Sequence, residues 1–171
     1  MVCGTHRSGK TTIAEKLAAD MKFHYISGRE EDAMANLGES LDELMKARRP
    51  GDPSGFILDD FIFGHTLEIH YIVATLKARN LKLDRVVYLE IANDVANKRK
   101  KFETIDRIEH PVAFEVCSSM LGESECLFHI DCQMRTVEEI YEEVYGEIKT
   151  LRPSTRDTLN LPAEMLVKEL S

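Results

Sequence analysis

The chain has little of what a secreted or membrane-spanning protein contains. Tryptophan is absent, and the 171 residues include only four cysteines, of which no two form a C-x-x-C pair or fit the spacing of a zinc module. No apolar run approaches the ~18 residues that cross a bilayer, and no signal peptide precedes the first motif. These absences argue against a disulfide framework and a membrane span. They predict an intracellular protein with reduced thiols, cytoplasmic or nuclear.

An excess of positive charge is also missing. The chain has 22 basic and 30 acidic residues, and its net charge is −8. This balance argues against a protein that binds nucleic acid over its whole surface, although a local basic groove remains compatible with it. With 43% hydrophobic residues, the length suits a single globular domain with a sizeable core.

What the chain does contain is a phosphate-binding loop. Residues 4–11 read G-T-H-R-S-G-K-T and fit the pattern G-x-x-x-x-G-K-[ST] without a mismatch. In such a loop, backbone N–H groups point at an anion, and the following helix adds its positive N-terminal end. Lys10 can then bridge the β- and γ-phosphates, and the Thr11 hydroxyl can bind Mg²⁺. The candidate nucleotide-binding residues are Gly4, Thr5, His6, Arg7, Ser8, Gly9, Lys10, Thr11 and Thr12.

Apolar strand patterns alternate with helical patterns five times along the chain. Strands are predicted at residues 1–3, 23–26, 56–58, 85–91 and 126–130. Helices are predicted at residues 12–21, 30–49 (interrupted at Gly38), 66–79, 94–102, 111–121 and 136–151. The alternation predicts an α/β protein with a three-layer α/β/α P-loop fold and a five-stranded parallel sheet. Thr136 and Glu139 form a capping box at the start of the last helix.

The third predicted strand ends in two acids, Asp59 and Asp60. An aspartate at this place, next to a phosphate loop, commonly holds Mg²⁺ through its water shell, so Asp59 joins Thr11 as a candidate metal residue. The alternative is a turn or capping aspartate. Asp60 either shares the shell of the ion or acts as a base toward a hydroxyl acceptor.

Taken in order, these elements resemble the adenylate kinase family of nucleoside monophosphate kinases. Beyond the phosphate loop, the likeness rests on G-F-I-L-D at 55–59, on the helix, loop and strand at 76–90, and on F-H-I-D at 128–131 with the helix that follows. It covers residues 1 to about 151, which we expect to form the kinase domain. Residues 152–171 would be a tail or a linker toward a further module.

The resemblance implies an ATP- and Mg²⁺-dependent kinase, with ATP rather than GTP as the donor. It implies that Lys10 and Asp59 act at the reaction centre together with Arg99 and, from a short lid, Arg107. Such groups neutralise charge on the transferred phosphoryl group. The alternative for both arginines is a solvated basic face around Lys98.

The segment that would bind the phosphate acceptor departs from the family pattern. The family follows D-G-F with Pro-Arg, and that arginine grips the acceptor phosphate. Here Asp60 stands at the glycine position and Phe63 at the arginine position. Arg29 and the pair at 48–49 are candidates for a replacement clamp, so the candidate acceptor residues are Arg29, Asp60 and Phe63. The aromatic residues Phe61 and Phe63 either stack on a base or belong to the core, and the core is favoured.

The acceptor-binding flap is also short, which leaves the acceptor cleft open. This arrangement resembles the kinase modules of bifunctional RNA-capping enzymes, which phosphorylate a 5′-monophosphate RNA end. Three hypotheses follow. The acceptor is a 5′-monophosphate, free or at an RNA end; or it is a hydroxyl, with Asp60 as base; or the chain binds nucleotide without efficient transfer.

Overall fold

The structure is a computed structural model that describes residues 1–5, 7–30, 32–47, 55–61, 66–92 and 126–151. Its centre is one parallel sheet with the strand order β2–β3–β1–β4–β5. The strands are β1 (Val2–Gly4), β2 (His24–Ser27), β3 (Phe56–Asp59), β4 (Val86–Glu90) and β5 (Leu127–Asp131). The predicted five-stranded parallel sheet is therefore confirmed, with strand ends that differ from the predicted ones by at most one residue.

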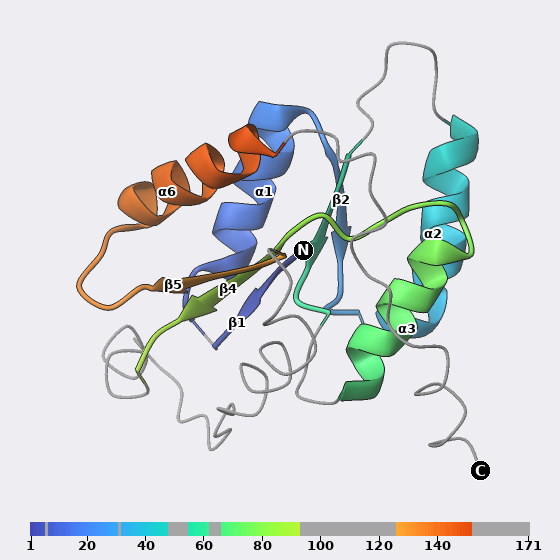
Figure 1. The fold of residues 1–171 in the computed structure, drawn as a ribbon, viewed down its shortest axis with the longest axis horizontal. Coiled ribbons are helices and arrows are strands. Elements are labelled where there is room, and N and C mark those ends of the chain that lie inside the picture. Colours follow the sequence, from blue (N-terminus) through green and yellow to red (C-terminus); the bar gives the residue numbers. More distant parts are fainter. Residues whose placement is uncertain (6, 31, 48–54, 62–65, 93–125, 152–171) are drawn as a thin grey trace.

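Two pairs of helices cover the two faces of the sheet (Figure 1). They are α1 (Lys10–Met21) with α6 (Val137–Thr150), and α2 (Ala33–Ala47) with α3 (Thr66–Lys77). Successive side chains of a strand point to opposite faces, so the apolar strands supply both cores. The first core contains Ile13, Leu17, Ile57, Val87, Leu89, Ile140 and Val144. The second contains Leu37, Leu41, Leu58, Ile69, Ile72 and Tyr88. The three-layer arrangement is thus confirmed.

The predicted interruption of the second helix is wrong, because α2 continues through Gly38. A Cβ atom at Gly38 would lie 2.7 Å from the guanidinium of Arg79. That guanidinium forms two hydrogen bonds with the Asp42 carboxylate, at 2.9 and 2.8 Å. The glycine therefore makes room for an ion pair that joins α2 to α3.

The last helix begins as its sequence predicts. The Thr136 hydroxyl accepts a hydrogen bond from the Glu139 N–H at 3.2 Å, and the Glu139 carboxylate accepts one from the Thr136 N–H at 2.8 Å. These reciprocal bonds satisfy N–H groups that the helix itself cannot pair. The predicted capping box is confirmed.

The described part of the chain contains three of the four cysteines. Cys3, Cys126 and Cys132 are all buried. The helices predicted at 94–102 and 111–121, and the tail at 152–171, lie outside the described residues. Within the described ranges, no helix combines the length and the apolar character that a bilayer crossing requires.

Gly4 has to be glycine for two reasons, and this can be tested. Its φ is +137°, and a Cβ atom there would lie 2.0 Å from the carbonyl oxygen of Leu89. We expect Gly4→Ala to lower the free energy of unfolding by at least ~2 kcal/mol, as strained backbone and a clash do. Urea denaturation measures the change.

Gly146 provides the matched control. It lies exposed in α6, and a Cβ atom there would meet nothing within 4 Å. We expect Gly146→Ala to raise stability by ~0.5–1 kcal/mol, since alanine is the better helix former. Equal stability of the two variants would contradict the close approach of Gly4 to β4.

Candidate active site

The candidate site lies at the carboxyl ends of β1 and β3. These strands are neighbours, with Val2 in register with Asp59. The chain leaves β1 toward α1 on one face, whereas α3 follows β3 on the other (Figure 1). Ligands of open α/β sheets bind where neighbouring connections diverge in this way. The phosphate loop and Asp59 both lie at this point.

The phosphate loop is shaped by two glycines and pinned to β4. Gly9 has φ +94° and open space at its Cβ position, so its backbone conformation alone requires glycine. The Thr5 N–H donates to the Leu89 carbonyl at 2.9 Å. The Ile91 N–H donates to the Thr5 hydroxyl at 2.8 Å. These bonds set where the loop starts relative to the sheet.

The polar side chains of the loop are directed inward. Lys10, the first residue of α1, is only 5% exposed, and its Nζ donates to the carbonyl of Thr5 at 3.0 Å. The Ser8 hydroxyl is buried and has no hydrogen-bond partner among the described residues. Buried polar groups normally have partners. A buried hydroxyl without a partner next to an inward lysine suits a loop that binds an anion.

Asp59 is fully buried and uses its two oxygens unequally. Its Oδ2 accepts hydrogen bonds from the Thr11 hydroxyl and from the Tyr25 hydroxyl, both at 2.7 Å. Its Oδ1 is buried without a partner among the described residues. Leaving a buried carboxylate oxygen unsatisfied is costly, and a hydrated cation would remove that cost.

The residues therefore fit the Mg²⁺ site that the resemblance implies. A hydroxyl and a carboxylate are the oxygen donors that Mg²⁺ prefers, and it commonly takes only one or two protein ligands beside phosphates and water. The described ranges contain no group of three or more His, Cys, Asp or Glu side chains placed to hold a metal.

Asp60 follows β3 in a left-handed conformation, with φ 61°. Its carboxylate faces two cations. Lys10 Nζ lies 3.4 Å from Oδ1, and Arg29 Nε lies 3.7 Å from Oδ2. Gly28 permits this approach, because a Cβ atom there would lie 2.5 Å from the Asp60 carbonyl oxygen. The structure thus brings two of the predicted acceptor residues, Arg29 and Asp60, together beside Lys10.

The other predicted site residues divide into two groups. Arg7 is part of the described loop, with φ 62°, and the Thr12 side chain is exposed on α1. Phe61 is fully buried in the core under α2 and α3, which confirms a core role for it. The predicted residues outside the described ranges are His6, Phe63, Arg99 and Arg107, together with the pair at 48–49.

Tyr25 also belongs to the candidate site, through its hydrogen bond to Asp59, whereas the sequence pattern predicts only that it lies in a strand. Burial first, and then its hydrogen bond to Asp59, raise the pKa of Tyr25 to about 12. Its hydroxyl therefore stays protonated, and able to donate, at neutral pH. The sequence carries only a weak sign of this contact. Residues 25 and 27 share one face of β2, but the register against β3 is needed to bring Tyr25 to Asp59.

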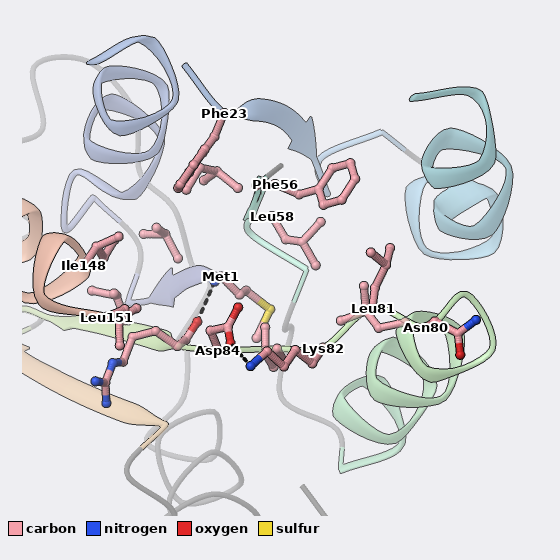
Figure 2. Close-up of a pocket in the computed structure, with 17 residues that line it drawn as sticks. Met1, Phe23, Phe56, Leu58, Asn80, Leu81, Lys82, Asp84, Ile148 and Leu151 are labelled. Carbon is pink, nitrogen blue, oxygen red and sulfur yellow. Dashed lines mark hydrogen bonds and ion pairs between the residues drawn. The ribbon is translucent and has the colours of Figure 1, made fainter. Parts of the chain in front are cut away.

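A pocket of about 430 Å³ lies at the opposite end of the strands from the candidate site (Figure 2). It is lined mainly by apolar side chains such as Met1, Phe23, Phe56 and Leu81, at the amino ends of strands and in the α3–β4 connection. The phosphate loop and Asp59 are at the carboxyl ends. The pocket is therefore separate from the candidate active site.

Comparisons with known proteins support the fold. No protein-family model matches the chain, and no curated protein matches its sequence. An unliganded sugar kinase from Janibacter sp. HTCC2649 has a similar structure, with TM-score 0.53 and 18% identity over 86% of this chain and 92% of that one. YorR from Bacillus subtilis, in complex with phosphorylated GDP, is also similar. Its TM-score is 0.53, with 17% identity over 87% of this chain and 96% of that one. At these identities the likeness shows the shared fold.

The anchor of the phosphate loop at Thr5 can be tested separately from catalysis. We expect Thr5→Val to lower the free energy of unfolding by ~1–3 kcal/mol, because the Ile91 N–H loses its acceptor in a partly buried place. Denaturation curves measure this change. Thr150→Val is the control, since its hydroxyl is exposed at the end of α6 and such substitutions stay within ~0.5 kcal/mol. A Thr5 variant as stable as the control would show that the bond to β4 does not anchor the loop.

Proposed function

We propose that the chain is an ATP- and Mg²⁺-dependent phosphotransferase of the adenylate kinase-like type. It moves the γ-phosphate to a 5′-monophosphate, carried by a free nucleoside monophosphate or by an RNA end. The observation that carries the proposal is the 2.7 Å hydrogen bond from Thr11 to Asp59. It joins the phosphate-binding end of α1 to the carboxylate end of β3, so donor and metal residues form one site.

Each residue of the donor side has a role that follows from its position. The N–H groups of the loop and the N-terminus of α1 hold the phosphates. Lys10 reaches them from within the loop and stabilises charge on the transferred group. Thr11 and Asp59 hold Mg²⁺, which when bound neutralises negative charge and orients the phosphates. In this proposal Arg99 and Arg107 close over the donor.

Arg29 and Asp60 support an anionic acceptor. A lone carboxylate would repel a phosphate, but both oxygens of Asp60 face cations, and Lys10, Arg29 and Asp60 together carry one net positive charge. Arg29 is 56% exposed, and its contact with Asp60 is long, at 3.7 Å. Its guanidinium therefore keeps donors for a phosphate, which arginine binds through paired N–H groups.

A second candidate is a small-molecule kinase that phosphorylates a hydroxyl, with Asp60 as the base. The observation in its favour is that Asp60 Oδ1 lies 3.4 Å from Lys10 Nζ, which puts a proton acceptor near the lysine that would contact the transferred group. In either case residues 1–151 would be the catalytic domain. Residues 152–171 would be a tail or linker, as in a module joined to another enzyme such as a guanylyltransferase.

Lys10→Ala tests the assignment as a phosphotransferase. We expect transfer to fall by ~100-fold or more, the scale of losing a preorganised charge-stabilising donor, with the far-UV circular dichroism unchanged. The assay follows radiolabelled γ-phosphate from ATP to four nucleoside monophosphates, to 5′-monophosphate RNA and to a set of hydroxyl acceptors. Lys77→Ala, exposed on α3, is the control. Near-normal turnover in Lys10→Ala would refute the assignment, and ATP binding without label on any acceptor would show a binding module.

Arg29→Ala and Asp60→Asn distinguish a 5′-monophosphate acceptor from a hydroxyl acceptor. With a 5′-monophosphate acceptor, Arg29→Ala should raise KM by ~10-fold or more, since a hydrogen bond to a charged group contributes ~1.5–3 kcal/mol. Asp60→Asn should leave kcat for that acceptor within ~10-fold, because a phosphate acceptor already presents an ionised oxygen and needs little help from a base. Steady-state kinetics measure both constants. Loss of transfer to a hydroxyl alone in Asp60→Asn would favour the second candidate.

A further inference from the structure

We propose that Tyr25 is a positioning residue of the metal site. Its hydroxyl holds Asp59 by Oδ2, so that Oδ1 remains directed to the coordination shell of the ion. The inference rests on the proposed Mg²⁺-dependent function. It adds a residue on β2 to a site that is otherwise built from the phosphate loop and β3.

The evidence is the unequal use of the two carboxylate oxygens. Oδ2 accepts from Thr11 on α1 and from Tyr25 on β2, whereas Oδ1 has no partner within the described ranges. A carboxylate held at one oxygen by donors from two elements cannot rotate freely. In the proposal Thr11 is itself a ligand of the ion. Tyr25 is then the donor whose bond to Asp59 is independent of the metal.

The fold explains why a tyrosine can reach this place. Ser27 is in register with Asp59, and Tyr25 lies two residues earlier on the same face of β2. The ring of Tyr25 packs with the core under α1. Its hydroxyl extends to Asp59. A phenylalanine would keep the ring in this core and remove only the hydroxyl.

A second pair in the molecule distinguishes positioning from general stabilisation. The Tyr141 hydroxyl on α6 donates to the Asp20 carboxylate, ten residues beyond Lys10 along α1. Both pairs join a partly or fully buried tyrosine to a carboxylate. Only the Tyr25 pair includes a proposed metal residue. Tyr141→Phe is therefore the matched control for Tyr25→Phe.

The experiment compares ADP affinity with Mg²⁺ and with EDTA, by titration calorimetry, for the wild type and both variants. The ratio of the two affinities measures what the metal contributes. We expect Tyr25→Phe to lower this ratio by ~10-fold or more, the usual effect of removing a partner of a metal ligand. Tyr141→Phe should keep the wild-type ratio. In turnover, Tyr25→Phe should raise the Mg²⁺ concentration for half-maximal rate and leave KM for the acceptor unchanged.

Each outcome has a defined meaning. If Tyr25→Phe keeps the wild-type ratio, or weakens ADP equally with and without Mg²⁺, Tyr25 is only structural and the inference is overturned while the proposed function stands. If the wild type itself shows no effect of Mg²⁺, the proposed function fails, and the inference with it. Should Tyr25→Phe not fold, Tyr25→Leu removes the same hydroxyl, and an unchanged ratio in that variant would overturn the inference.

Discussion

The hydrogen bond between Thr11 and Asp59 is the contact on which the site depends. It links the first turn of α1 to the last residue of β3, two elements that also meet through apolar packing. Asp59 is fully buried, and a buried carboxylate needs hydrogen-bond donors. Thr11 and Tyr25 provide such donors to one of its two oxygens only. The other oxygen of this buried carboxylate has no partner among the described residues.

Most of the fold could be predicted from local patterns. The phosphate loop, the acid after β3 and the capping box at Thr136 each depend on residues that are close in sequence, and the structure has all three. Gly38 was misjudged because its role is set by Arg79, on another helix. The pairing of Asp60 with Arg29, and the contact of Tyr25 with Asp59, depend on how β2 and β3 align. No pattern within either segment contains that alignment.

The local charge of the site also differs from that of the whole chain. The net charge is −8, yet two cations, Lys10 and Arg29, both face the Asp60 carboxylate near the N-terminus of α1. A chain that is acidic overall disfavours the binding of long polyanions over its surface, and a local group of cations remains compatible with it. The net charge sums over the whole chain. It can therefore argue against a class of partner, but it does not describe the charges at the site.

The place of β1 in the sheet has a consequence for how the protein is made. β1 is the first strand in the chain but lies at the centre of the sheet, where its partners are Asp59 on one side and residues 87–89 on the other. These pairings are distant in sequence, and contacts of that kind form slowly because long loops must close first. During synthesis, the phosphate loop can take its final shape only after β4 has left the ribosome. A partly made chain would therefore lack the loop conformation that the finished protein has.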